Sequence, residues 1–202
     1  KKVCENTDII DKVLSFAEFK LNKEAKKTNG QKVNKLRNIP KLDDANNAGT
    51  KNSELCTLIL TEGDSAKTMA ISGLSVIGRD NYGVFPLKGK VLNVKDASQK
   101  QIMDNSEITN LKKILGLVEG KEYKNTSSLR YGKVMILADQ DHDGSHIKGL
   151  VLNVFHTLWP SLLKNSFINS MLTPIVKVSK GKTTHSFYNL TDYDGWKSNT
   201  KD

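Results

Sequence analysis

The sequence predicts an α/β fold, with a mostly parallel β-sheet and helices on both of its faces. Two short apolar runs, 56–61 and 133–138, are bounded by turn-forming residues, which is typical of strands buried on both sides. Each run passes directly into an acidic turn and then into a helical pattern. Ligands of open α/β sheets bind at the carboxyl ends of the strands, so we expect the acidic turns to form the functional site.

The N-terminal quarter predicts one helix and a polar connection. Apolar residues recur at close to helical spacing from Ile9 to Ala25. The stretch Lys23–Lys35 is polar and charged, which predicts either a charged helix end or a mobile linker. We expect compact structure to begin near Leu55.

The rest of the chain alternates between strand and helix patterns. We predict strands at Cys56–Thr61, Tyr82–Leu87 and Lys133–Ala138, helices at Ala66–Ser72, Ala97–Asn105, Ser106–Leu115 and Ser145–Leu158, and a β-hairpin of Ile175–Ser179 and Thr184–Tyr188. Pro160 should end or kink the helix before it. A polar loop is expected around 120–128.

Composition indicates a basic protein with an acidic pocket. The net charge is +9, and residues 1–52 hold 12 lysines and arginines against 7 acids, a net +5. A basic body around an acidic pocket suits an enzyme that holds a polyanion and a metal together. A merely soluble surface would have the same charge, so that alternative stays open.

No apolar run approaches the ~20 residues of a membrane span, and no signal peptide is visible. Cys4 and Cys56 form no metal or disulfide pattern, which favours a reducing compartment. The chain starts at Lys1, without a methionine, and its last residues up to Asp202 resemble the interior of a polypeptide rather than an end. We therefore expect it to be an excised piece of a longer polypeptide.

The turn 139–144 predicts a metal site. Asp139, Asp141 and Asp143 alternate after a strand, and three like charges within about 7 Å repel one another. A hard divalent cation such as Mg²⁺ offsets that repulsion. An EF-hand loop would need a glutamate at its twelfth position, where this chain has Leu150. An Asp-x-Asp phosphatase would not explain a second acidic turn, and a solvated acidic turn remains the plain alternative.

That second turn is Glu62-Gly63-Asp64-Ser65. Gly63 permits a tight turn, and Asp64 or Ser65 can cap the following helix. If the two acid-bearing strands are neighbours, Glu62, Asp139 and Asp141 converge on one site of Mg²⁺ size. Alternatively, Glu62 is only a helix-flanking acid favoured by the helix dipole.

Other polar residues flank these turns. Lys88, Lys90 and Asn93 surround a glycine after a strand, which suits phosphate contacts but also describes an exposed basic loop. His142 and His146 are not expected to bind Mg²⁺, which prefers oxygen. Phosphate contact or helix capping fits them better.

Together these motifs resemble the Toprim domain of type II DNA topoisomerases, and they are more similar to the eukaryotic enzymes than to bacterial gyrase. The matching segments are Ile39–Ala45, Gly49–Ser53, Leu58–Lys67, Pro86–Val94, Leu129–Gly149 and Trp159–Lys164. In order and spacing they extend from about Ile39 to Ser179. The resemblance implies a Toprim, Rossmann-like sheet.

The resemblance also implies roles for the site residues. Glu62, Asp139 and Asp141 are expected to hold Mg²⁺, which Mn²⁺ or Ca²⁺ can replace, and Asp143 to assist a second ion or orient the first. Glu62 would also do acid–base work during religation. The loop with Lys88, Lys90 and Asn93 would face DNA at the cleavage site, although the family commonly has arginine in place of Lys88. Tyr131, which follows Arg130, is expected to be scaffold.

The parent enzyme implied is an ATP-dependent isomerase of the nucleus. It would act as a homodimer that cuts both strands of one duplex, passes a second duplex and reseals the first. We expect 1–52 to lead from the ATPase and transducer region, 53–180 to be the metal-binding Toprim domain, and 181–202 to begin the connection to the DNA-cleavage core. ATP and the attacking tyrosine would belong to domains outside this chain, so the fragment alone should be inactive.

Two other functional classes of protein are alternatives to this interpretation. A stand-alone Toprim nuclease or primase-like enzyme would lack the segments 49–53 and 86–94. A non-catalytic DNA-binding module with a relict site would have lost an acid, and none is lost here.

Overall fold

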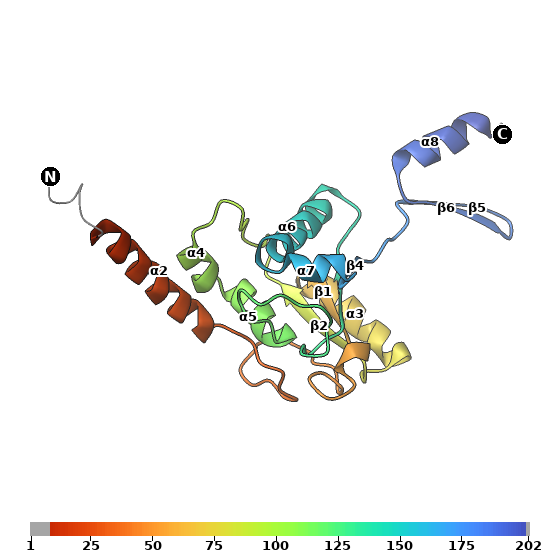
Figure 1. The fold of residues 1–202 in the computed structure, drawn as a ribbon. Helices are drawn as coiled ribbons and strands as arrows, with labels where there is room; N and C mark the ends of the chain where they lie inside the picture. The colour runs from red at the N-terminus through yellow and green to blue at the C-terminus, as the bar shows by residue number, and fades with distance from the viewer. Residues whose placement is uncertain (1–8, 201–202) are drawn as a thin grey trace.

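The computed structural model describes residues 9–200, and its core is a four-stranded sheet with strand order β2-β1-β3-β4 (Figure 1). Every pairing in this sheet is parallel. The elements are α2 (Ile9–Lys27), η1 (Ser53–Leu55), β1 (Thr57–Glu62), α3 (Gly63–Ile77), β2 (Tyr82–Leu87), α4 (Gln99–Asp104), α5 (Ser106–Leu115), β3 (Lys133–Leu137), α6 (His142–Leu158), α7 (Pro160–Lys164), β4 (Ile168–Ser170), β5 (Val176–Lys180), β6 (Thr183–Phe187) and α8 (Leu190–Asn199).

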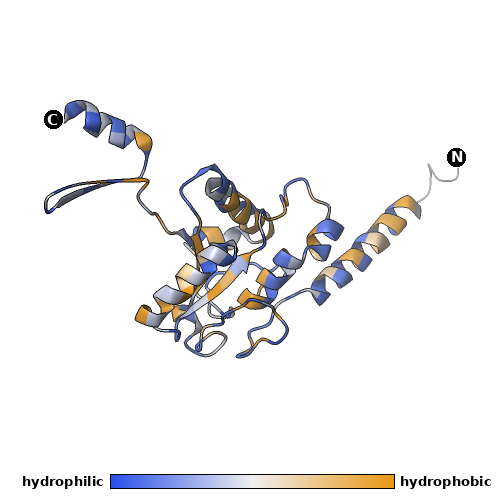
Figure 2. Ribbon diagram, turned by 180° about the vertical axis from the view of Figure 1, so that it is seen from behind, coloured by the Kyte–Doolittle hydropathy of each residue, from blue (hydrophilic) through white to orange (hydrophobic). Residues whose placement is uncertain are grey.

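Helices cover both faces of the sheet, as predicted (Figures 1 and 2). Alternate residues of a strand point to opposite faces, so Leu58 and Leu60 of β1 pack against α5 and α6 in the larger core. Ile59 points the other way, and it packs with Ala70 and Leu74 of α3 in a smaller cluster. The central strands are therefore buried on both sides, which is why their apolar runs are continuous.

Most predicted elements are confirmed, with shifts at their ends. The strand at Tyr82–Leu87, the helix at Ser106–Leu115 and the hairpin are present. The short strand β4 and helix α8 were not predicted. β4 spans only Ile168–Ser170 at the sheet edge, too short for a periodic pattern. Pro160 does end the preceding helix, and it begins the new helix α7, because proline suits the first turn of a helix.

The expectation that compact structure begins near Leu55 is wrong. Ala45 and Ala48 are buried in the core. Asp43 forms an antiparallel bridge with Val84, with N···O distances of 2.9 and 2.7 Å. The segment 39–50 thus covers the outer edge of β2 and shields its backbone groups. Its apolar residues recur every three positions, at Ile39, Leu42, Ala45 and Ala48. That spacing matches neither the helix period of 3.6 nor the strand period of 2, so it predicted no element here.

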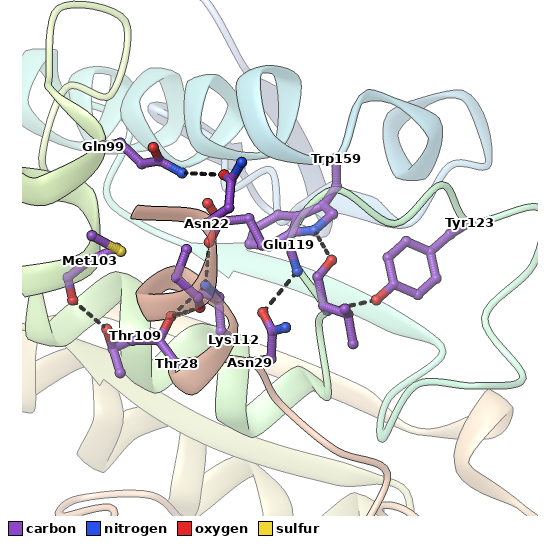
Figure 3. Close-up of polar contacts among 12 residues, drawn as sticks. Asn22, Thr28, Asn29, Gln99, Met103, Thr109, Lys112, Glu119, Tyr123 and Trp159 are labelled. Carbon is purple, nitrogen blue, oxygen red and sulfur yellow. Dashed lines mark hydrogen bonds and ion pairs between the residues drawn. The ribbon is translucent and has the colours of Figure 1, made fainter. Parts of the chain in front are cut away.

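The C-terminal end of α2 is fixed to the body by buried polar contacts (Figure 3). The Lys112 ammonium, almost fully buried, lies 2.6 Å from Thr28 Oγ1 and 2.6 Å from Glu119 Oε2. Asn29 Oδ1 accepts a hydrogen bond from the Glu119 N–H at 2.9 Å. A charge-assisted network of this kind holds its members in one arrangement. Of the two alternatives for 23–35, helix end or mobile linker, the structure shows a helix end followed by a docked connection.

The first turns of α2 extend away from the body, and the side chains of Val13, Phe16 and Phe19 are exposed (Figure 1). At the opposite end of the molecule, the β5–β6 hairpin and α8 stand apart from the sheet. No helix in the part of the chain that the structure describes is long and apolar enough to cross a membrane. Cys56 is buried, and burial raises the pKa of its thiol; Cys4 lies outside the described residues.

Candidate functional site

The carboxyl edge of the sheet carries both acidic turns. β1 and β3 are parallel neighbours, and Thr61 pairs with Leu137. Glu62, at the end of β1, therefore lies beside the segment that leads from β3 to Asp139. The condition for the two acidic turns to meet, that their strands are neighbours, is therefore fulfilled. Parallel register brings together two turns that are far apart in the sequence.

Glu62 has one oxygen that the protein leaves unsatisfied. The residue occupies the N-cap position of α3, yet its side chain makes no capping hydrogen bond. Gly63, with a φ of 80°, supplies the left-handed turn that joins β1 directly to α3. Oε2 of Glu62 is buried without a hydrogen-bond partner. A buried carboxylate oxygen costs free energy unless a cation or donor satisfies it, so this atom fits a metal ligand.

The acidic turn 139–144 is closed by the start of α6. Asp141 caps the helix, because its Oδ1 accepts a hydrogen bond from the Gly144 N–H at 2.7 Å. This cap makes the helix begin at His142 rather than at the predicted Ser145. A Cβ on Gly144 would lie 2.1 Å from the Asp139 carbonyl oxygen. Only glycine permits this approach, which fixes the backbone that carries the acids.

Lys148 also reaches this turn, and the sequence analysis did not single it out. Its Nζ lies 3.2 Å from Gln140 Oε1 and 3.5 Å from the carbonyl oxygen of Asp139. The ammonium charge partly offsets the repulsion between the neighbouring carboxylates. The sequence could have indicated Lys148, because it is a lysine in the early turns of the helix that follows the acidic turn.

The predicted ligands share one edge without forming one coordination shell. Within residues 9–200, no three aspartate, glutamate, histidine or cysteine side chains lie close enough together to hold a metal ion. The structure does not assemble Glu62, Asp139 and Asp141 in the absence of an ion, and one oxygen of Asp141 is engaged in capping. Their convergence on one bound ion stays a prediction. Mg²⁺ keeps several waters and is usually held by one or two carboxylates with substrate phosphates. Glu62 and Asp139 at one edge fit such an open site.

The loop after β2 brings basic side chains to the same edge. Lys88 and Lys90 are both exposed, and Lys90 Nζ lies 3.1 Å from Asp143 Oδ1. Asn93 Oδ1 accepts a hydrogen bond of 2.7 Å from the side chain of Asn153 on α6. The three predicted phosphate-contact residues therefore belong to one loop that is tied to α6, the helix that follows the acidic turn.

The prediction that Asp64 caps α3 is wrong. Asp64 lies inside the first turn, where the helix dipole favours an acid, and its Oδ2 is 2.5 Å from Lys41 Nζ. Lys67 donates to the Lys41 carbonyl oxygen at 2.7 Å and pairs with Asp43 at 2.6 Å. Lys41 itself has a left-handed φ of 65°. The segment 39–45 thus forms a strap across the start of α3, which no helix or strand pattern indicated.

Arg130 and Tyr131 are scaffold residues, as predicted. Both are fully buried. Arg130 Nη2 and the Tyr131 hydroxyl each lie 2.5 Å from a carboxylate oxygen of Asp44, and the same hydroxyl accepts a hydrogen bond from the Ala45 N–H at 3.0 Å. Burial, with the charge of Asp44, raises the pKa of Tyr131 above its ordinary range. A buried, neutral phenol in this position is no nucleophile.

His142 and His146 are exposed on the first turns of α6. His142 is the first residue of that helix, but Asp141 supplies the capping bond. Phosphate contact by either histidine stays a prediction.

A parallel α/β domain with carboxylates and lysines gathered at its carboxyl edge has an arrangement suited to binding a metal ion and phosphate groups. The Toprim domain profile matches residues 57–175, more than half of the chain. The chain belongs to the Toprim family, as its motifs predicted.

Similar proteins carry the domain within much longer chains. DNA topoisomerase 2 of Pisum sativum is 60% identical over 198 residues, which are 97% of this chain and 14% of that protein. DNA topoisomerase 2-alpha of Homo sapiens is 57% identical over 203 residues, covering 98% of this chain and 13% of that protein. The structure is also similar to the crystal structure of the Plasmodium falciparum topoisomerase II DNA-binding, cleavage and re-ligation domain. The TM-score is 0.78, with 57% sequence identity, and the match covers 83% of this chain and 23% of that one.

Proposed function

We propose that this chain is the metal-binding part of the DNA-cleavage site of a type II DNA topoisomerase of the eukaryotic type. The observation that carries the proposal is the unsatisfied, buried Oε2 of Glu62, placed at the sheet edge that also holds Asp139 and the basic loop. Identity of 57% or more to proteins named DNA topoisomerase 2 supports it.

The ion that fits this site is Mg²⁺, with Mn²⁺ or Ca²⁺ able to replace it. All the available ligands are carboxylate oxygens, the type that hard divalent cations prefer. Glu62 and Asp139 would hold the ion directly. Asp141 would supply a third ligand through the carboxylate oxygen that does not cap α6. Asp143, paired with Lys90, would assist a second ion or orient the first. When bound, the ion stabilises negative charge on the scissile phosphate and the leaving 3′-oxygen.

The protein's own side chains position the phosphate and move the proton. Lys88, Lys90 and Asn93 present ammonium and amide groups at the edge, where they can hold backbone phosphates of the cut strand. Glu62 lies between that loop and the β3 turn in the order of the sheet edge. A carboxylate there can accept the proton of the 3′-hydroxyl during religation, and in its protonated form it can give that proton to the leaving 3′-oxygen during cleavage.

The proposal for the parent protein extends beyond this chain. It is an ATP-dependent, homodimeric enzyme of the nucleus, which cuts one duplex, passes another and religates. ATP and the attacking tyrosine would belong to the remaining polypeptide, since the chain spans about one seventh of the curated relatives it matches.

Calorimetric Mn²⁺ titration of the chain tests the ligand assignment. Glu62→Ala and Asp139→Ala should each weaken binding by about tenfold or more, whereas Glu122→Ala, an exposed acid in the loop after α5, should leave it unchanged. Asp141 has two roles that need two variants. Asp141→Asn keeps a good helix cap but removes the charge, while Asp141→Ala removes both. If Asp141 is a metal ligand, both variants should lose Mn²⁺ affinity. If only Asp141→Ala loses affinity, Asp141 is a helix cap and not a ligand.

Activity of the chain by itself separates this proposal from a stand-alone nuclease. With neither a nucleophile domain nor an ATPase domain, the chain should neither nick nor relax supercoiled plasmid, although it should bind DNA in a salt-sensitive manner. Metal-dependent nicking that disappears in Asp139→Ala would replace the topoisomerase assignment by the nuclease.

A further inference from the structure

The β5–β6 hairpin carries an unbalanced positive charge. Between Asp143 and Asp192 the sequence has no acidic residue, and Lys177, Lys180 and Lys182 all lie on the hairpin or its turn. The three lysines are exposed. In the described range 9–200, no carboxylate lies within ion-pair distance of any of them; the ion pairs present involve other lysines and arginines. A cluster of exposed lysines without counter-charges attracts a polyanion.

The hairpin leaves the sheet at the same edge as the acidic turns. All four strands are parallel, so their carboxyl ends lie at one edge. β1 is followed there by Glu62, β2 by Lys88 and β3 by Asp139. β4 is followed by the linker 171–175, which leads into the hairpin, and the Met171 N–H still donates to the Ile136 carbonyl oxygen at 3.0 Å. The linker therefore starts from the proposed cleavage site.

One face of the hairpin consists only of hydrogen-bonding side chains. Lys177 pairs with Ser186 and Ser179 pairs with Thr184 across the antiparallel ladder, and residues of a pair lie on the same face. The hydroxyls of Ser179 and Thr184 lie 3.0 Å apart. Ammonium and hydroxyl groups are the side-chain donors that contact DNA phosphates. Figure 2 shows the hairpin mostly in the hydrophilic colours.

The opposite face anchors the hairpin on α8 through aromatic rings. Trp196 of α8 lies 5.3 Å from Phe187 and 5.5 Å from His185, measured between ring centroids. Tyr193 lies 5.5 Å from Phe187 and 6.4 Å from Trp196. Aromatic pairs at these distances contribute beyond their buried area. They hold the two-stranded ribbon in shape, although α8 has no fully buried residue and an isolated hairpin is marginal in water.

We infer that the β5–β6 hairpin is a second phosphate-contact site, which binds the backbone of the cleaved duplex beside the cleavage site. The inference rests on the proposed function, since it concerns the duplex held at that site. The ligand is the phosphate backbone of double-stranded DNA, read without sequence preference. The polar face with Lys177, and the turn with Lys180 and Lys182, supply the contacts.

Chain geometry limits how far along the duplex these contacts can fall. The linker 171–175, at about 3.5 Å per residue, spans at most ~18 Å. Each hairpin strand adds about 17 Å at 3.4 Å per residue. With about 3.4 Å per base pair, the lysines can reach phosphates up to roughly 5–10 base pairs from the cleaved bond.

The test compares variants of the full-length enzyme on linear duplexes. The hairpin variant replaces Lys177, Lys180 and Lys182 by alanine. Its matched control replaces three exposed lysines elsewhere, Lys100, Lys113 and Lys124, which gives the same change of net charge. Affinity for a duplex of about 50 base pairs is measured over a range of salt concentrations. The same series is run on a duplex with arms of only about 4 base pairs on each side of the cleavage site, which offers the hairpin fewer phosphates within its reach.

For the long duplex, the hairpin variant should bind about tenfold more weakly, and the slope of log K against log salt should shrink by about 2–3. The control variant should match the wild type, and the loss in the hairpin variant should be smaller on the short duplex than on the long one. A triple Lys→Arg variant, which keeps the charges, should restore binding.

Three results overturn the inference. They are an unchanged salt slope in the hairpin variant, an equal loss in the control variant, and normal DNA binding with weakened dimer assembly, which would make the hairpin a protein contact. A wild-type enzyme that neither binds nor cleaves duplex DNA would instead refute the proposed function itself.

Discussion

Lys90 and Asp143 form an ion pair, with Nζ 3.1 Å from Oδ1, that joins the loop after β2 to the first turn of α6. The pair links a predicted DNA contact to a predicted metal-site acid. Both side chains are more than half exposed, at 57% and 68%, so the pair contributes only about 0–1 kcal/mol to stability. A weak pair can exchange partners, and a DNA phosphate can take the ammonium while a cation takes the carboxylate.

Replacing Lys90 by alanine in the full-length enzyme should weaken DNA binding for all sequences. Loss of one lysine–phosphate contact should reduce the salt slope by about 1. Mn²⁺ affinity without DNA should stay nearly intact, because an ammonium group does not bind the ion, and added metal should not restore cleavage. Filter binding over a salt series checks this. Normal cleavage with an unchanged slope would make the loop a solvated surface.

The ion pair also predicts different roles for two acids. Asp143 already has a cationic partner, whereas no ion pair within residues 9–200 involves Asp139. Asp139→Asn should therefore lower Mn²⁺ affinity by about tenfold or more, and Asp143→Asn by clearly less. Calorimetric titration of both variants measures the ratio. Equal losses would show that Asp143 is a full ligand that leaves Lys90 when metal binds.

Glu62→Gln should separate metal binding from folding. The change keeps the shape of the side chain but removes the charge from its buried, unsatisfied oxygen. Without metal, the free energy of unfolding should rise by about 1 kcal/mol, because no charge remains to be desolvated. Adding Mn²⁺ should raise the melting temperature of the wild type but not of the variant. Equal stabilisation of both proteins by Mn²⁺ would remove Glu62 from the ligand set.

Two glycines of α6 form a matched pair. A Cβ on Gly144 would lie 2.1 Å from the Asp139 carbonyl oxygen, whereas a Cβ on Gly149 meets nothing within 4 Å. Gly144→Ala should lower the free energy of unfolding by about 3 kcal/mol and weaken Mn²⁺ binding by displacing the turn. Gly149→Ala should instead stabilise by about 0.5–1 kcal/mol through helix propensity. Urea unfolding of both variants checks the signs; a neutral Gly144→Ala would mean that the turn is not tightly packed.

Tyr131 should make the protein sensitive to alkaline pH. Burial and Asp44 raise the pKa of its phenol above the ordinary value of 10.0, so its contribution to stability is complete below pH 10. Above that pH the unfolded chain loses the phenolic proton and the folded chain keeps it. Stability should then fall by about 1.4 kcal/mol per pH unit from this group.

Urea unfolding between pH 8 and pH 11 measures that slope, with the pH range set by the ordinary pKa of about 10. Tyr131→Phe should be less stable near neutral pH, because it loses the hydrogen bonds to Asp44 and Ala45. Its stability should also fall less steeply above pH 10. Tyr188→Phe, at an exposed position, is the control. The same alkaline slope in wild type and Tyr131→Phe would contradict the burial argument.

The sequence predicted most of the sheet because parallel strands that are buried on both faces consist of continuous apolar runs. Two of the three predicted strands are followed directly by glutamate or aspartate, so the site also followed from local order: Glu62 ends β1, and Asp139 comes just after β3. Strand β4 could not be found in this way, since one partly buried and two exposed residues at a sheet edge carry no period.

By itself, the sequence determined which chemical groups stand at the carboxyl edge, because in a parallel sheet strand direction alone fixes where each following turn lies. Only the tertiary structure decided how those groups are used. The Asp141 cap, the Lys41–Asp64 pair and the Lys90–Asp143 pair join residues through side-chain geometry. The strap 39–45 packs with neither a helix nor a strand period. Contacts of that kind depend on distances between elements, which a linear pattern of apolar and polar residues does not encode.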